Sequence, residues 1–213
     1  MPGRSVRTCC EVLPGERTFP AESETAHLHL GHECTAMRKL IEHTLLSLDG
    51  VFDNPFWSRD YRDDAYMKDG WGQVLASDAM LMGRGTYEGF ARIWPARTDP
   101  WANRINAMPK YVFSSTLASA DWNNCTIIRG DIATEVARLK EVEGPDLITY
   151  GHGQLGQTLL KLGLLDALEV SIYPIIVGQG KSFFRDGESA RLKLVSAKTY
   201  GAGVVHLTYA PEH

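Results

Sequence analysis

Two glycine-containing junctions are the parts of this sequence best suited to ligand chemistry. In the first, the apolar residues 79–82 lead into Gly83-Arg84-Gly85-Thr86. This order predicts a buried strand, a glycine turn and a new helix, whose first backbone N–H groups and positive dipole end favour an anion. Arg84 adds a planar, permanently charged guanidinium group that suits phosphate. Thr86 is interpreted as a cap for the helix or as a second contact to the same phosphate.

A second junction follows the apolar residues 147–150 and has the pattern G-x-G-x-x-G. Its glycines allow the backbone to approach a pyrophosphate closely, in the strand–turn–helix context that such a pattern requires. No acidic residue ends a partner strand about 20 residues later, which disfavours an ordinary NAD-type dinucleotide domain. Two junctions in one chain therefore indicate a phosphorylated dinucleotide rather than a lone phosphate. The motif is Gly151-His152-Gly153-Gln154-Leu155-Gly156, and we interpret His152 as a loop residue rather than a catalyst.

Hydroxyl and carboxylate side chains supply further candidates. Ser114 and Ser115 end a predicted strand, where they would either receive a ribose phosphate or form a simple turn. Asp63 and Asp64 begin a predicted helix, a position at which the helix dipole favours carboxylates. The alternative for either aspartate is a buried acid that faces a heterocycle. The residues alone leave both questions open.

The composition argues against several classes of function. The formal net charge is −4 and there is no block of lysine and arginine, so nucleic acid is not an expected partner. No apolar run approaches the roughly 18 residues of a membrane helix, and no export signal is present, so we expect a cytoplasmic protein without a membrane segment. The glycine loop at residues 174–181 lacks P-loop spacing, which argues against ATP or GTP hydrolysis.

The cysteines and histidines do not predict a metal site. The four cysteines have no metal-ligand spacing and are interpreted as reduced thiols. His27, His29 and His32 form either a metal-binding tract or scattered side chains of a flexible segment. Residues 1–36 lack convincing periodicity, so we expect a flexible extension there, followed by one globular domain over residues 37–213.

The order of predicted elements argues for an α/β fold with a mostly parallel sheet. Helices alternate with strands along the chain, and two strands around a glycine-rich turn close it as an antiparallel pair. Strands are predicted at residues 39–46, 79–82, 110–115, 126–129, 146–150, 167–176, 193–200 and 204–209. Helices are predicted at residues 63–75, 86–93, 131–142 and 154–162, with a short one near 101–106.

Four segments taken in order resemble one known family. They are Ser47-Leu-Asp-Gly50, residues 82–88, Gly151-x-Gly-x-Leu155, and the stretch from Leu165-Asp166 to the glycine loop that ends at Gly180. The family is the dihydrofolate reductase-like family, in the branch that contains the C-terminal reductase domain of the bacterial bifunctional riboflavin-biosynthesis protein. The resemblance covers about residues 37–210. It implies a three-layer α/β sandwich with a mostly parallel central sheet, a C-terminal antiparallel hairpin, and NADPH at the carboxyl ends of the strands.

The resemblance also implies roles for individual residues. Arg84 and Thr86, which follow Gly83, correspond to a pair that contacts the diphosphate, and Ser114 and Ser115 lie beside the 2′-phosphate. A second phosphate-binding turn is implied at Gly151, Gly153, Gln154 and Leu155. Asp49 and Gly50 fall where the first loop nears the nicotinamide, and Asp63 falls nearest the acid that holds the pterin. Asp63 and Asp49 are therefore the candidates for a catalytic role.

The function that this resemblance implies is NADPH-dependent reduction of a small polar heterocycle or sugar derivative. This activity resembles that of the 5-amino-6-(5-phosphoribosylamino)uracil reductase of riboflavin biosynthesis. The H-x-E and C-x-x-C signatures of the partner deaminase are absent from the sequence, so we expect a stand-alone reductase that forms a homodimer. The alternative is a homodimer that binds a nucleotide or flavin without turnover. A true dihydrofolate reductase is less favoured, because the segment around Asp63 matches poorly.

Overall fold

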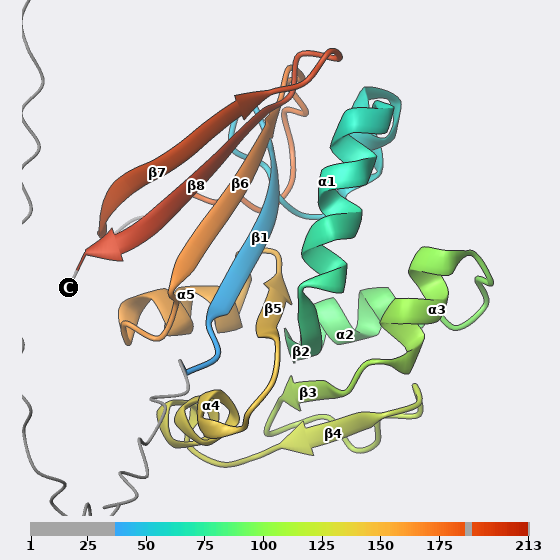
Figure 1. Ribbon diagram of the computed structural model, residues 1–213, viewed down its shortest axis with the longest axis vertical. Helices are drawn as coiled ribbons and strands as arrows, with labels where there is room; N and C mark the ends of the chain where they lie inside the picture. Colours follow the sequence, from blue (N-terminus) through green and yellow to red (C-terminus); the bar gives the residue numbers. More distant parts are fainter. Residues whose placement is uncertain (1–36, 186–188, 213) are drawn as a thin grey trace, which may run out of the picture. The chain divides into compact units, whose positions relative to one another are not determined.

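Eight strands in one sheet organise the part of the chain that the structure describes. The computed structural model describes residues 37–185 and 189–212, so the predicted extension at residues 1–36 lies outside the described residues. The strand order is β4-β3-β2-β5-β1-β6-β8-β7 (Figure 1). The first six strands in sequence are parallel, β8 is antiparallel to β6, and β7 is antiparallel to β8. The strands are β1 (Leu40–Ser47), β2 (Ser77–Gly83), β3 (Lys110–Phe113), β4 (Cys125–Ile128), β5 (Asp146–Tyr150), β6 (Ala167–Tyr173), β7 (Arg191–Thr199) and β8 (Val205–Glu212).

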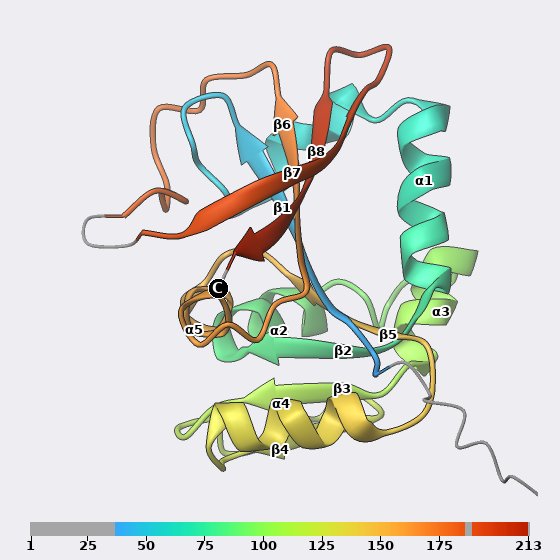
Figure 2. The same cartoon turned by 60° about the vertical axis from the view of Figure 1, so that its left-hand side comes forward.

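Helices connect the parallel strands, apart from β3 and β4, which a loop joins, and they cover both faces of the sheet (Figure 2). Apolar side chains of α1, α2 and α3 pack with Met80, Met82 and Ile148 on one face. Side chains of α4 and α5 pack with Leu81 and Leu147 on the opposite face, because successive strand residues point to opposite sides. The helices are α1 (Asp64–Leu75), α2 (Arg84–Ala91), α3 (Pro100–Ala107), α4 (Ile132–Glu141) and α5 (Gln154–Lys161), and a 3-10 helix covers Pro55–Tyr61.

Several element ends differ from the predicted ones for local reasons. The strand predicted to reach residue 176 ends at Tyr173, because Pro174 has no N–H group for the sheet ladder. The helix predicted to start at Thr86 starts at Arg84, and its N-cap is Gly83 without a side-chain cap. The cap interpretation of Thr86 is therefore wrong. These differences leave the predicted order of elements and the mostly parallel sheet intact.

Candidate functional site

The carboxyl edge of the parallel strands brings the predicted cofactor residues together. Strands β3, β2, β5 and β1 are consecutive neighbours in the sheet, so the turns that follow them lie next to one another. These turns carry the predicted set: Asp49 and Gly50 after β1, Gly83, Arg84 and Thr86 at the end of β2, Ser114 and Ser115 after β3, and Gly151, Gly153, Gln154 and Leu155 after β5.

The two glycine junctions abut each other. A Cβ atom placed on Gly83 would lie 3.3 Å from Cβ of Leu155, in the first turn of α5. The Thr86 hydroxyl donates to the carbonyl of Tyr150 at 3.4 Å, which ties the first turn of α2 to the end of β5. Gly151 takes a φ of +77°, which favours glycine, and its N–H donates to the His43 carbonyl at 2.8 Å. The helix N-termini of α2 and α5 therefore open side by side at this edge.

The turn after β3 is held by two arginines. Arg84 donates from Nη1 to Thr116 Oγ1 at 3.0 Å and pairs through Nε with Glu88 at 2.7 Å. Arg129 donates to the carbonyls of Ser114, Ser115 and Leu117 at 3.3, 3.0 and 2.7 Å. Sequence reasoning missed Arg129, since nothing in its local pattern marks a residue that closes a turn of another loop. Two guanidinium groups thus stand beside the serine turn.

Asp49 bridges the loop after β1 to the loop after β6. Its carboxylate accepts from the Ser47 hydroxyl at 2.7 Å and from the N–H groups of Val177 and Gly178 at 3.1 and 2.7 Å. These hydrogen bonds, the one from Ser47 foremost, lower the pKa of Asp49 to about 2. Gly50 takes a φ of +84° in the same turn. These contacts favour a carboxylate that fixes the two loops, and an ionised acid has no proton to give at neutral pH. The catalytic role suggested for Asp49 stays a prediction.

Asp63 is the N-cap of α1. It accepts from the N–H of Tyr66 at 2.8 Å, which confirms that an aspartate begins this helix. The pKa of Asp63 is lowered by this bond and by the N–H groups of Gly201 and Ala202, in the turn between β7 and β8. The aspartate thus joins α1 to the hairpin turn. Its predicted catalytic role stays a prediction, with capping as the function that these contacts favour.

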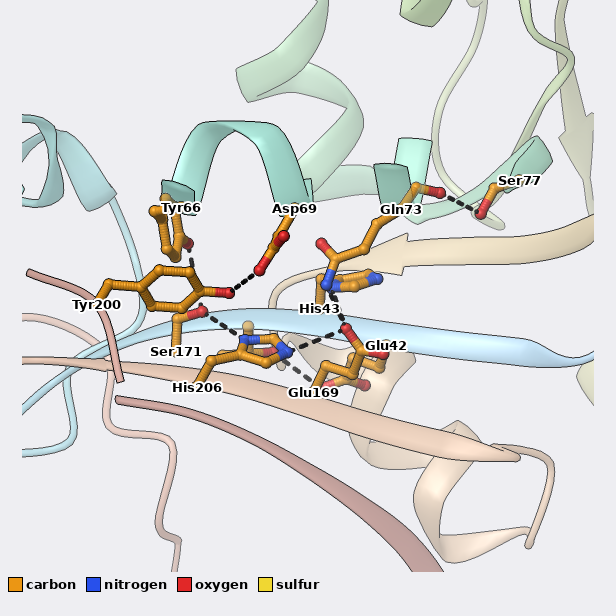
Figure 3. Close-up of polar contacts among 11 residues, drawn as sticks. Glu42, His43, Tyr66, Asp69, Gln73, Ser77, Glu169, Ser171, Tyr200 and His206 are labelled. Atoms are coloured by element: carbon orange, nitrogen blue, oxygen red, sulfur yellow. Dashed lines mark hydrogen bonds and ion pairs between the residues drawn. The ribbon is translucent and has the colours of Figure 1, made fainter. Parts of the chain in front are cut away.

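A cluster of ionisable side chains lies between α1 and the sheet, and sequence reasoning missed it (Figure 3). We call His43, Glu169 and His206 the histidine–glutamate cluster. Glu169 Oε2 lies 3.1 Å from Nδ1 of His43 and 3.4 Å from Nε2 of His206. Gln73 of α1 donates to the same oxygen at 2.6 Å. Three neighbouring strands, β1, β6 and β8, therefore converge on one carboxylate oxygen.

The charges within this cluster follow from burial and pairing. Burial lowers the pKa of His43 to about 4, so its ring is neutral at pH 7 and its Nδ1–H donates to Glu169. For Glu169, burial opposes ionisation, but the hydrogen bond to His206 and the two nearby imidazoles outweigh it and lower the pKa. Glu169 is consequently a buried, ionised acceptor at neutral pH.

A line of hydroxyl groups extends the cluster toward the aromatic side chains of α1. Ser171 Oγ lies 2.9 Å from Nδ1 of His206, and the Tyr66 hydroxyl donates to Ser171 at 3.3 Å. The ring of Tyr150, the last residue of β5, contacts the rings of His43 and Phe90 in tilted arrangements, each at a centroid distance of 5.7 Å. Through His43, the cluster therefore contacts the last residue of β5, the strand that leads into the second glycine junction.

The cluster opens into a hollow of about 490 Å³ between α1 and the β7–β8 hairpin. Glu169 and His206 form its floor, and it is lined further by Lys68, Asp69, Gln73, Ser196, Lys198, Tyr200 and Thr208. Within residues 37–185 and 189–212, no group of histidine, cysteine and acidic side chains is arranged to hold a metal ion. In the same residues, no helix is long and apolar enough to cross a bilayer. Charged and hydrogen-bonding side chains make up most of the lining of this hollow.

One signal in the sequence could have pointed to this cluster. Glu169 and Ser171 are two residues apart in a strand, so they share a face, as do His206 and Thr208. His43 lies with Glu42 and Thr44 at the centre of β1, between the apolar residues 40–41 and 45–46. Polar residues that alternate with buried apolar ones in a central strand mark a face that is not simple core.

Residues 38–206, which span both glycine junctions and the histidine–glutamate cluster, match the RibD C-terminal domain. This chain belongs to the RibD C-terminal domain family. A Bacillus subtilis (strain 168) relative, the uncharacterized protein YyaP, is 31% identical over 181 residues, which cover 81% of this chain and 94% of YyaP.

Solved structures show that this RibD-family chain has the predicted fold. A Shewanella sp. PV-4 protein named for riboflavin biosynthesis superposes with a TM-score of 0.67 at 20% identity, covering 82% of this chain and 99% of the other. Dihydrofolate reductase from Enterococcus faecalis, complexed with NADP(H), superposes with a TM-score of 0.55 at 16% identity, covering 82% and 97%. The dihydrofolate reductase-like α/β architecture is thereby confirmed.

Proposed function

We propose that this protein is an NADPH-dependent reductase of a small polar heterocycle or sugar derivative, similar to the uracil-type reductase of riboflavin biosynthesis. The observation that carries the proposal is the convergence of two glycine junctions and the serine turn at one edge of the sheet. Two helix N-termini and two arginines meet there. Such an arrangement suits a ligand with several phosphate groups.

Two glycines at this edge of the sheet leave room for the phosphate groups of a dinucleotide. Gly85 and Gly153 both have ordinary negative-φ or extended backbone, and a Cβ atom on either would meet no other atom within 4 Å. Packing therefore does not require glycine at these positions. A missing side chain instead leaves the N-termini of α2 and α5 uncovered, so that phosphate oxygens can reach their N–H groups.

The proposal assigns roles to the turns. Gly153 and Gln154 at the start of α5, with Gly83 and Thr86 at the start of α2, would hold the diphosphate. The resemblance pairs Arg84 with the diphosphate, but Arg84 reaches Thr116 beside the Ser114–Ser115 turn. We therefore propose that Arg84 and this turn hold the 2′-phosphate instead. When bound, NADPH supplies a hydride from C4 of its nicotinamide. The residues of this chain would hold the molecule that accepts the hydride, on the face of the sheet covered by α1, and would provide the proton.

The proton source on the acceptor side is the histidine–glutamate cluster and its hydroxyl line. Reduction of a C=N or C=O bond takes one hydride and one proton. His206 borders the open hollow and contacts Ser171, which contacts Tyr66. In this relay Ser171 would accept a proton from His206 and pass its own proton to the Tyr66 hydroxyl, which would donate its proton to the acceptor. Glu169 holds the His206 ring in place through Nε2.

Calorimetric titration with NADPH, NADP⁺ and NADH tests the cofactor. Tight NADPH binding with much weaker NADH binding is the expected result. NADPH oxidation with 5-amino-6-(5-phosphoribosylamino)uracil, dihydrofolate and related pyrimidines, pterins and sugars then tests turnover. Binding without any oxidation would favour a nucleotide-binding protein without turnover. Absence of all binding would overturn the reductase proposal.

We also propose the homodimer that the resemblance implies. Strand β7 is an edge strand of the sheet, and Leu194 and Val195 on it are more than half exposed. An exposed edge with apolar side chains is a surface that proteins usually cover. Sedimentation at micromolar concentration should give a dimer, and a Val195→Lys variant should shift it toward a monomer.

A further inference from the structure

A buried ion pair lies beneath the second glycine junction, on the face of the sheet opposite the histidine–glutamate cluster. His152 lies between Gly151 and Gly153 in the turn, yet its side chain points inward and is 2% exposed. Its Nδ1 lies 2.8 Å from Oε1 of Glu42, which is 0% exposed. Strand β1 carries Glu42 and pairs with β5, so the pair links the strand to the turn that follows its neighbour.

Neighbouring side chains separate the Glu42–His152 pair from solvent. The His152 ring faces Phe183 at a centroid distance of 4.3 Å. Glu42 accepts from Thr44 at 3.1 Å, and its Oε2 is buried without a partner. A Cβ atom on Gly156 would lie 2.4 Å from this oxygen, so the third glycine of the motif lets α5 rest directly on the carboxylate. The first turn of α5 and the carboxylate are therefore in contact.

The charges around the pair are few. Glu42 faces His152 from β1, and Gln157 of α5 donates to the His152 carbonyl at 3.4 Å. Gln157 in turn accepts a hydrogen bond from Arg185 at 3.1 Å. Arg185 lies on the loop before β7 and is the charged side chain at the end of this chain of contacts. His152 is consequently the one ionisable group in direct contact with the Glu42 carboxylate among the described residues.

This placement sets a requirement on anion binding at the turn. With one proton shared between its members the pair is neutral overall, and without that proton it carries a net charge of −1. A buried negative charge under the N-terminus of α5 would repel a phosphate bound above it and offset the helix dipole. A phosphate ligand therefore favours the pair that holds its proton, and binding is coupled to proton uptake.

We propose that His152 is a cofactor-positioning residue, and that the Glu42–His152 pair must hold a proton for the turn at residues 151–156 to accept the cofactor's diphosphate. The inference rests on the proposed NADPH function and adds a proton-linked element beneath its phosphate site. It also explains why a buried polar pair occupies a place where apolar side chains would be easier to bury.

Calorimetry with NADP⁺ as the probe tests the proposal. Wild-type protein titrated in two buffers of different ionisation enthalpy, over a series of rising pH values, should take up an increasing fraction of one proton per NADP⁺. The dissociation constant should then rise by as much as about tenfold per pH unit. The Glu42→Gln variant keeps a hydrogen-bonding side chain but loses the buried charge, so its affinity should not depend on pH.

Controls separate the possible failures. The matched Glu141→Gln variant alters an exposed glutamate at the end of α4 and should keep the wild-type proton uptake. Wild-type binding without proton uptake would overturn the inference and leave the proposed function standing, even if the Glu42 variant did not fold. Proton uptake that persists in a folded Glu42→Gln variant would also overturn it. Absence of NADP⁺ binding to the wild type would overturn both proposals.

Discussion

Arg84 Nη1 lies 3.0 Å from Thr116 Oγ1, so the residue that follows β2 reaches into the turn that follows β3. The contact joins the first glycine junction to the serine turn across two neighbouring strands. Glu88 holds the same guanidinium group from the next helical turn at 2.7 Å. Arg84 is thereby fixed with part of its donor fork still open to solvent, since its side chain is 51% exposed. A guanidinium group that is held in place with some of its N–H donors free is well arranged to bind a phosphate.

Replacement of Arg84 by alanine should weaken NADPH binding by about 1.5–3 kcal/mol, the range for a hydrogen bond to a charged group. NADH binding should change less if Arg84 faces the 2′-phosphate. Calorimetry with both nucleotides measures the difference. Arg97→Ala removes an exposed arginine that pairs with Asp99 and should leave both affinities unchanged. Equal NADPH affinity in wild type and the Arg84 variant would remove Arg84 from the site.

Gly153→Ala should weaken NADPH binding without harming the fold. The backbone of Gly153 is extended and no atom lies within 4 Å of a Cβ there, so a methyl group meets only the ligand. Gly89→Ala in α2 is the matched control, because its Cβ also meets nothing and it lies beyond the helix start. That control should raise stability by about 0.5–1 kcal/mol and keep the affinity. Thermal unfolding measures the stability of each variant, and calorimetry measures its NADPH affinity. Equal NADPH affinities for the wild type and the Gly153 variant would contradict a phosphate bound next to Gly153.

The glycine junctions and the order of elements were predictable because their signals are local. An apolar run followed by glycine and a helical pattern identifies a strand–turn–helix unit without knowledge of its neighbours. The prediction of Asp63 at a helix start follows in the same way and is confirmed. The helix predicted from residue 131 is also confirmed, with Asp131 as its N-cap. The family resemblance then supplied the arrangement of these units in a sheet.

The histidine–glutamate cluster was not predictable from such signals. Its members lie on β1, β6 and β8, and only the strand register places His43 opposite Glu169 and Ser171 opposite His206. The ion pair of Glu42 with His152 likewise depends on the neighbouring positions of β1 and β5. Register is a property of the assembled sheet, so single-strand patterns cannot give these pairs.

Asp63→Ser and Asp63→Ala distinguish a cap from a catalytic acid. Serine keeps an N-cap acceptor, so the Tm of that variant should stay near the wild-type value, whereas alanine should lower it by roughly 2–4 °C. NADPH affinity and turnover should follow the wild type in the folded serine variant. Thermal unfolding and NADPH oxidation are the two measurements. A stable serine variant without turnover would show that the Asp63 carboxyl takes part in the chemistry.

His43 should make the fold sensitive to mild acid. The ordinary pKa of 6.5 applies in the unfolded chain, and burial lowers it to about 4 in the folded protein. Between these values the unfolded chain binds a proton that the folded protein does not, so stability falls as the pH decreases from about 6.5 to about 4. The full loss from this group is about 3 kcal/mol. Glu169, whose pKa is also lowered, adds a further loss only as the pH falls below about its ordinary value of 4.5.

Urea unfolding at several pH values measures this dependence, with His43→Gln as the test variant. Glutamine can still donate a hydrogen bond to Glu169 but does not titrate, so the variant should lose much less stability than the wild type between about pH 7 and about pH 5. Its stability at neutral pH should be the lower of the two, because the ring packing against Tyr150 is lost. Parallel curves for the two proteins would mean that the buried imidazole accepts its proton in the folded state, with Glu169 as its counter-ion.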